Sequence, residues 1–219
     1  MHFEMLVEGQ TELTCLSILM SEIVGEYGHP HTWKIHKHQG IGRLPDDLSA
    51  QPNRHDRTLL HNLPSKLKAY GRSMGTQEVV VIVADLDDRD DCVAFKHELL
   101  AVLDACEARP NILIRIAIEE LEAWYLGDES AVRTAYPKMN QAAFATYTQD
   151  AQCGTWEQLA KIIHADGGKG LLDLGKRSRR ILEEKRKWAA AIAPNMNVEE
   201  NASPSFCCFR NGLRRLAKG

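Results

Sequence analysis

The chain of 219 residues is 44% hydrophobic and 26% charged, which is typical of a soluble globular protein with one sizeable core or a domain with a substantial appendage. No run of 18 apolar residues occurs, and Glu4 and Glu8 fall where a signal peptide needs apolar residues. The sequence therefore predicts a cytoplasmic protein with no membrane-spanning segment.

Charge is unevenly distributed along the chain. Residues 169–219 hold 12 Lys and Arg against five Asp and Glu, a surplus of seven, so the rest carries −10 in a chain whose net charge is −3. An acidic body with a basic C-terminal segment is compatible with metal-binding carboxylates in one place and a phosphate-contacting surface in another. Each of these basic residues also fits a solvated helical face.

The cysteines and histidines do not predict a metal site. The six cysteines form no CxxC pair, so we expect reduced thiols and neither a disulfide framework nor a zinc centre. Four of the nine histidines lie between residues 29 and 38, but no cysteine or carboxylate stands at ligand spacing from them.

The first half of a βαβ unit is predicted at the start of the chain. Residues 2–7 form a strand, and a helix with an apolar face follows, with Thr11 as its N-cap. Glu8 then lies at the carboxyl end of the strand, and Gly9 relieves the sharp turn. Glu8 also fits a second interpretation, in which its carboxylate only interacts with the dipole of the following helix.

The next segment is predicted to contain a strand, a long loop and a helix. Residues 33–39 alternate well enough for a strand, and residues 40–57 carry Gly, Pro, Asp and Asn without a period. A loop of this length is either functional or disordered. Residues 59–72 read as a helix that is broken near Pro64.

Residues 79–91, VVVIVADLDDRDD, are the most informative stretch. The β-branched run at 79–84 predicts a central parallel strand that is covered on both faces, and functional groups of such sheets gather at the carboxyl ends of the strands. Asp85 and Asp87 lie there two residues apart, so both carboxylates point the same way and suit a hard divalent ion. The alternative is a solvated acidic turn, and either Asp90 or Asp91 is expected to cap the helix predicted at 92–106.

Acids also follow the fourth predicted strand, at residues 111–118. On a helix beginning there, Glu119 and Glu122 would be neighbours, while Glu120 would face elsewhere. Acidic residues thus directly follow three of the four predicted strands. Because those ends meet at one edge of a parallel sheet, the sequence predicts a site there.

The remainder of the chain is predicted to be helical. Thr155 and Gln158 form a capping-box pattern, and helices are expected at 181–192 and 206–216. The Gly-rich run at 167–170 lacks the preceding strand and the spacing of a phosphate-binding loop. Phosphate contacts are expected from five basic residues of this part: Arg179, Arg180, Arg186, Arg214 and Arg215.

Taken together, these motifs resemble a known superfamily. The Val7-Glu8-Gly9-Gln10-Thr11-Glu12 stretch after a first strand and Asp85-Leu86-Asp87 after a hydrophobic third strand resemble the Toprim domain of topoisomerases, primases and OLD-type nucleases. The segments at 117–124, 155–157, 185–189 and 203–206 are similar to a narrower bacterial family of small Toprim-like proteins of unassigned function. Members of that family are often encoded beside an ATPase and suspected of roles in phage defence.

The resemblance implies a Toprim-like α/β domain at residues 1–127, a mainly parallel sheet flanked by helices, with a helical extension at 128–219 packed on it. It implies catalytic Glu8 and Lys185, with Mg²⁺ or Mn²⁺ held by four acids: Asp85, Asp87, Glu119 and Glu122. The expected function is metal-dependent cleavage of phosphodiesters in DNA or RNA. The alternative is a non-catalytic nucleic-acid-binding or regulatory subunit of an ATPase complex, whose ATP site must lie in a separate protein because this chain has no Walker motif.

Overall fold

The centre of the molecule is a sheet of four parallel strands. The computed structural model describes residues 1–175 and 178–218. The strands are β1 (His2–Val7), β2 (Thr32–Lys37), β3 (Glu78–Asp85) and β4 (Ile112–Ala117), in the order β2-β1-β3-β4. All three strand pairs are parallel, so the carboxyl ends of the four strands share one edge of the sheet.

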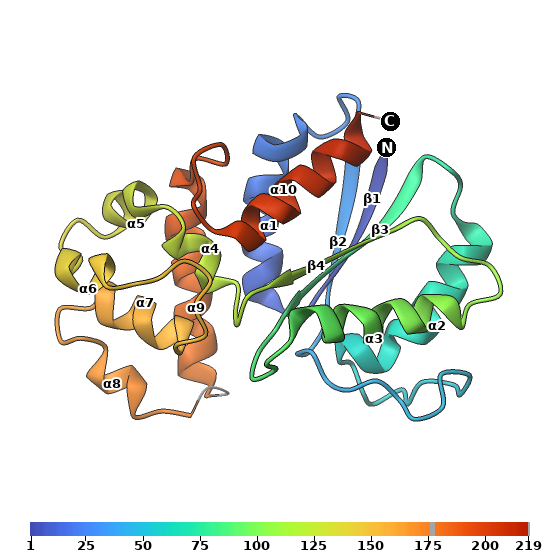
Figure 1. Cartoon of the computed structure of the whole chain (residues 1–219), viewed down its shortest axis with the longest axis horizontal. Helices are drawn as coiled ribbons and strands as arrows, with labels where there is room; N and C mark the ends of the chain where they lie inside the picture. Colours follow the sequence, from blue (N-terminus) through green and yellow to red (C-terminus); the bar gives the residue numbers. More distant parts are fainter. Residues whose placement is uncertain (176–177, 219) are drawn as a thin grey trace.

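Helices cover both faces of this sheet (Figure 1). One face is covered by α1 (Gln10–Val24) and α10 (Pro204–Ala217), with α9 (Arg179–Ile192) packed against α1, and the other face is covered by α2 (Leu59–Ser73) and α3 (Cys92–Asp104). The valines and isoleucine of β3 are wholly buried, as expected for a strand that contacts apolar side chains on both sides. The predicted α/β fold with a parallel sheet and a helical C-terminal part is confirmed.

Shorter helices fill the C-terminal part of the chain. They are α4 (Glu122–Leu126), α5 (Glu129–Ala135), α6 (Gln141–Ala145), α7 (Thr155–Ile163), α8 (Lys169–Leu172) and the 3₁₀ turn η1 (Ala193–Asn195). The indole of Trp124 stacks on Phe209 of α10 at 4.9 Å and donates to the Ser205 hydroxyl. One apolar core therefore includes residues from both parts of the chain, and the predicted boundary at residue 127 stays a prediction.

Two local predictions are wrong. The N-cap of α1 is Gly9, in an extended conformation, and not the predicted Thr11. The helix begins at Gln10, so Thr11 is already a buried residue within it. Helix α2 continues through Pro64 because Leu59, Leu63 and Leu67 bury its apolar face on either side of the proline. This packing offsets the backbone hydrogen bond that a proline removes from a helix.

The predicted cap of α3 and the predicted long loop are confirmed. Asp91 caps α3 through hydrogen bonds from the Val93 and Ala94 backbone N–H groups, and residues 38–58 contain only turns, bends and irregular backbone. All six cysteines are free. Among the helices of the described residues, none combines the length and apolarity needed to cross a lipid bilayer.

Candidate active site

The carboxyl ends of β1 and β3 bring Glu8 and Asp85 together. Val7 pairs with Val83 across the sheet, so the acid that follows β1 lies beside the last residues of β3. The Asp85 backbone N–H donates to Glu8 Oε1 at 2.7 Å, and only 9% of Glu8 and 8% of Asp85 is exposed. This hydrogen bond fixes the orientation of the Glu8 carboxylate at the edge of the sheet.

Lys185 reaches from the middle of α9 to two glutamates that follow β4. Its Nζ lies 3.1 Å from Glu120 Oε2 and 3.2 Å from Glu122 Oε2. The two glutamate side chains are 2% and 1% exposed, and the lysine side chain is 11% exposed. A buried pair of this kind keeps its charges only through close mutual contact.

Glu12, in the first turn of α1, is a further buried acid of this region. It shares the buried stripe of the helix with Cys15 and Leu16 instead of facing solvent. A side chain at Gly9 would place its Cβ 3.2 Å from Glu12 Oε2, so the glycine leaves room for this carboxylate. We call the following residues the acidic cluster: Glu8, Glu12, Asp85, Glu120, Glu122 and Lys185.

Burial shapes the protonation of these acids. It raises the pKa of Asp85 well above its usual range, and repulsion from the other four acids of the cluster raises it further. Burial also raises the pKa of Glu8, with repulsion from Glu12 and Asp87 adding to it and the Asp85 backbone N–H opposing it. Two acids at the strand ends therefore resist ionisation in the absence of a counter-charge.

The lysine compensates only part of this charge. Burial raises the pKa of Glu122 to about 7, although Lys185 opposes the rise. Burial acts against the ammonium of Lys185, but attraction from Glu122 and Glu120 prevails and raises its pKa above the usual value. Because the cluster has one charged lysine for five buried acids, part of the negative charge is uncompensated. The cluster is therefore suited to bind protons or a further cation at neutral pH.

Two carboxyl oxygens indicate where a cation would be held. Asp85 Oδ1 and Glu122 Oε1 are buried and accept no hydrogen bond within the described part of the chain. Carboxylate oxygens of this kind are the ligands that Mg²⁺ prefers. The donor chemistry therefore fits a divalent ion, although no three His, Cys, Asp or Glu residues in the described ranges are already spaced to hold one.

Glu119 lies elsewhere, which corrects the helical placement expected for it. Its φ of 61° turns the chain away from the strand before α4 begins, because a left-handed residue cannot continue a helix. The carboxylate accepts hydrogen bonds from the backbone N–H groups of Cys153, Gly154 and Thr155 and from the Thr155 hydroxyl. Glu119 thus caps α7, and the capping box expected from Thr155 and Gln158 does not form, since Gln158 donates to the Ala143 carbonyl.

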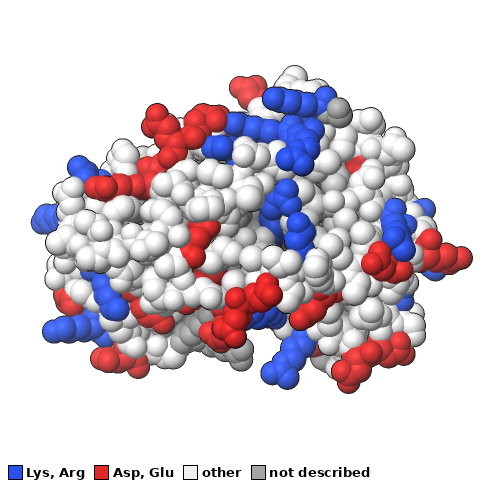
Figure 2. Space-filling view, in the orientation of Figure 1, with Lys and Arg blue, Asp and Glu red and all other residues white. Residues whose placement is uncertain are grey.

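Asp87 lies beside the cluster without being buried in it. It also has a positive φ, of 53°, and its backbone N–H donates to the Glu119 carbonyl at 2.8 Å. This hydrogen bond ties the loops after β3 and β4 together. Repulsion from Asp87 helps to raise the pKa of Glu8. Figure 2 shows several Asp and Glu side chains in the middle and lower middle of the face in view.

The five arginines predicted to bind nucleic acid lie on two different helices. Arg179, Arg180 and Arg186 are exposed on α9, and Arg179 pairs with Glu183 at 2.9 Å. Arg214 of α10 is engaged by Glu199 and by the Ile23 carbonyl of α1, while Arg215 is exposed. Figure 2 shows Lys and Arg side chains gathered over α10. The structure does not join the five into one surface with the acidic cluster.

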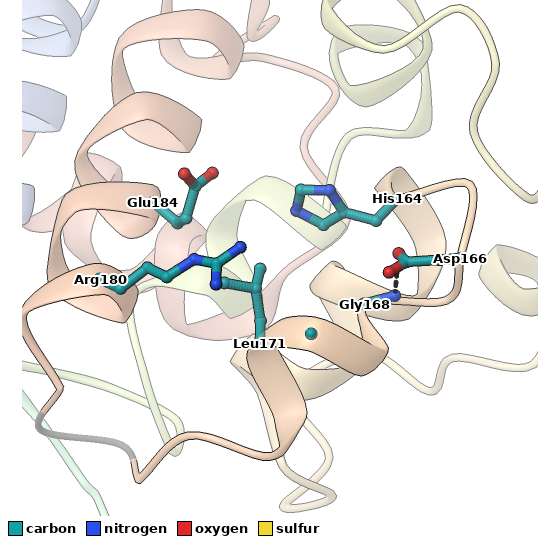
Figure 3. Close-up of a pocket in the computed structure, with 7 residues that line it drawn as sticks. His164, Asp166, Gly168, Leu171, Arg180 and Glu184 are labelled. Carbon is teal, nitrogen blue, oxygen red and sulfur yellow. Dashed lines mark hydrogen bonds between the residues drawn. The ribbon is translucent and has the colours of Figure 1, made fainter.

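Arg180 lines a small cavity of about 110 Å³ between α7, α8 and α9 (Figure 3). His164 and Asp166 lie across from it, and the Asp166 carboxylate accepts a hydrogen bond from the Gly168 backbone N–H. Glu184 of α9 also faces this cavity. None of the lining residues belongs to the acidic cluster, so this cavity is a separate feature.

Sequence reasoning missed Glu12 and Glu120 as members of the cluster. Glu12 could have been found, because it stands three and four residues before Cys15 and Leu16 and therefore shares their face of a helix. Glu120 had no such signal. Its direction depends on the left-handed turn at Glu119, which the sequence does not indicate.

The fold and this site define an α/β protein whose parallel sheet carries a buried acidic cluster at its carboxyl edge. Residues 7–214 match the family model described as Domain of unknown function (DUF4276), and the chain belongs to that family. Searches of curated proteins and of solved structures find no match to the chain.

Proposed function

We propose that this protein hydrolyses phosphodiester bonds of DNA or RNA with the help of Mg²⁺ or Mn²⁺. The observation that carries the proposal is the acidic cluster, in which five buried acids, two of them in contact with Lys185, lie at the edge where α/β proteins place their reactive groups. The resemblance of the Glu8 and Asp85–Asp87 motifs to Toprim nucleases supports the same chemistry. An effector role in phage defence beside an ATPase is part of this proposal.

Asp85 and Glu122 are the first candidates to hold the ion, because Asp85 Oδ1 and Glu122 Oε1 are buried without a hydrogen-bond partner in the described residues. Asp87, half-buried at the same edge, is a further candidate. We place Glu119 outside this set because its carboxylate already caps α7. A bound divalent ion supplies polarisation of a phosphoryl oxygen and a lower pKa for bound water.

Glu8 and Lys185 have distinct roles in this proposal. The Asp85 N–H holds one oxygen of Glu8, and its raised pKa makes the ionised carboxylate a stronger proton acceptor for an attacking water. Lys185 is charged and in contact with Glu120 and Glu122, so it orients these carboxylates and can neutralise charge that develops on phosphate.

The test is a cleavage assay with the purified protein on duplex DNA, single-stranded DNA and RNA, in the presence of Mg²⁺, Mn²⁺ or a chelator. Asp85→Asn should reduce metal-dependent cleavage by about 10²-fold or more, since it removes a ligand charge while keeping the size of the side chain. The matched control is Asp88→Asn, an exposed acid of the same loop. A well-folded wild type that binds nucleic acid but does not cut it with either metal would favour the non-catalytic subunit of an ATPase complex.

A further inference from the structure

A second hollow lies at the carboxyl end of the edge strand β2. Its volume is about 720 Å³, and its walls come from residues 36–39, from five residues between 52 and 57, and from Asn62 and Lys66 of α2. The irregular loop 38–58, which runs along the bottom of the view in Figure 1, therefore forms much of this wall. We call this hollow the β2 pocket.

The charged groups that line the β2 pocket are mostly cations. Four are lysines or arginines: Lys37, Arg54, Arg57 and Lys66. The only acid among the lining residues is Asp56, and its carboxylate already accepts hydrogen bonds from the Thr58 backbone N–H and hydroxyl. Within the described residues, the exposed side chains of Arg54 and Arg57 form no hydrogen bond or ion pair. The pocket thus presents positive charge that the protein leaves uncompensated.

Neighbouring groups do little to change this balance. Burial lowers the pKa of Lys66, and Glu4 of β1 opposes the change. Glu4 itself also contacts the His2 and His36 rings. Burial lowers the pKa of His38 as well, and repulsion from Lys66 and His36 contributes to that shift. Cations that repel one another in a hollow favour the entry of an anion.

The β2 pocket adjoins the acidic cluster. The His38 backbone N–H donates to the Val7 carbonyl at 3.0 Å, and the Gly40 N–H donates to the Glu8 carbonyl at 2.9 Å. Since β2 is the neighbour of β1, the pocket and Glu8 occupy adjacent positions along one edge of the sheet. An extended chain that lies along this edge meets cations first and carboxylates next.

We infer that the β2 pocket binds backbone phosphates of a nucleic-acid strand, next to the phosphodiester that reaches the acidic cluster. This inference rests on the proposed function for the role of the cluster, but the binding itself does not require cleavage. The cations come from the strand end, the loop and α2, so they suit successive phosphates along a strand better than one phosphate held by a single loop. Such contacts position a strand without reading its bases.

The experiment measures binding of a fluorescein-labelled duplex DNA across a salt series, with a chelator present so that no metal-dependent cleavage occurs. The variant is Arg54→Gln combined with Arg57→Gln, and both residues are exposed, so the fold should persist in a thermal melt. The log–log salt slope should fall by about 1.8, because each phosphate contact on duplex DNA contributes roughly 0.9, and Kd at physiological salt should rise roughly tenfold or more. Arg54→Lys with Arg57→Lys should keep most of the slope.

The matched control is Arg72→Gln with Arg109→Gln, two exposed arginines at the amino edge of the sheet, one in the last turn of α2 and the other beyond the end of α3. This control should leave both slope and Kd unchanged. Equal slopes for wild type and the Arg54/Arg57 variant, or no measurable binding by the wild type, would overturn the inference. Displacement of the oligonucleotide by inorganic phosphate beyond the effect of an equal ionic strength of chloride would also overturn it, since that result indicates a site for a single free phosphate.

The two proposals can fail separately. If the wild type binds with the predicted salt slope but does not cleave with Mn²⁺, the β2 pocket stands and the nuclease proposal fails. If cleavage is observed but the Arg54/Arg57 variant binds like wild type, the nuclease proposal stands and the β2 pocket does not bind the strand.

Discussion

The carboxyl edge of the sheet carries two charged regions of opposite sign that are built in different ways. At β1, β3 and β4 the acids are buried and held by strand ends and helices, whereas at β2 most of the cations lie on a loop or point to solvent. A buried charge needs a partner, but a solvated charge does not. The acidic cluster is therefore coupled to the stability of the fold, and the β2 pocket is free to be changed without it.

The largest expected effect on stability belongs to the buried region. Lys185→Met keeps an unbranched side chain but removes the one cation that contacts both Glu120 and Glu122 within the described part of the chain, so we expect a loss of roughly 3–5 kcal/mol in the free energy of unfolding at neutral pH. Denaturant unfolding measures this loss. Lys187→Met, two residues along α9 and exposed, should change stability by less than about 0.5 kcal/mol. Similar effects of both substitutions would mean that the buried ion pairs do not hold the cluster.

The second largest effect is the pH dependence of stability, which we expect to come from the buried acids of the acidic cluster and not from the solvated β2 pocket. The folded-state pKa of Glu122 is about 7 against an ordinary 4.5, so the folded protein binds this proton more strongly than the unfolded chain does. Stability should therefore fall as pH rises from about 4.5 to about 7, by up to about 3 kcal/mol from this residue alone. Urea unfolding in the presence of a chelator measures the fall, and Glu122→Gln should reduce it.

Two outcomes test the interpretation of that experiment. Glu98→Gln, which alters an exposed acid of α3, should reproduce the wild-type pH profile. Divalent ions should reduce the fall in the wild type, because a cation bound to the ionised carboxylates stabilises the folded state by mass action. A wild-type stability that does not decrease over this pH range would contradict the burial argument.

A smaller effect is expected at Glu119, which is acidic and near the edge but does not belong to the cluster. Glu119→Gln weakens the hydrogen bonds from four donor groups at the start of α7, so we expect a loss of about 1–3 kcal/mol. The increase in thermal stability on adding Mg²⁺ or Mn²⁺ should remain as large as in wild type. If that increase disappears while the loss of stability is absent, Glu119 is a metal ligand and its capping role is minor.

The smallest effect is expected for the arginines of α9. Arg179→Gln combined with Arg180→Gln should lower the salt slope of DNA binding by less than about 0.9, because Arg179 already pairs with Glu183 and Arg180 lines a separate cavity. The salt series described for the β2 pocket gives the comparison directly. A reduction as large as that of the Arg54/Arg57 variant would make α9 an equal part of the binding surface.

Sequence reasoning reached the sheet but only part of the cluster. The apolar runs and the acids directly after them located Glu8 and Asp85, because a strand end fixes where its next residue lies. The predicted directions of the Glu119 and Glu120 side chains are wrong, because a helix was expected to begin at Glu119. The left-handed backbone at Glu119 turns its own side chain away from the cluster and that of Glu120 into it. The family resemblance identifies Lys185 as a candidate catalytic residue, but it does not predict the contacts of Lys185 with Glu120 and Glu122. No local sequence pattern links residues so far apart.

The order of residues along the chain also bears on how the acidic edge forms during synthesis. All five acids of the cluster leave the ribosome well before their counter-charge, because Lys185 follows Glu122 by 63 residues. Until α9 emerges, those carboxylates lack their contact with the Lys185 ammonium, so we expect them to remain hydrated and this edge of the nascent sheet to stay open. We therefore expect the docking of α9 to be the step that removes water from this edge, and a nascent chain stalled before that helix to leave its acids exposed to water.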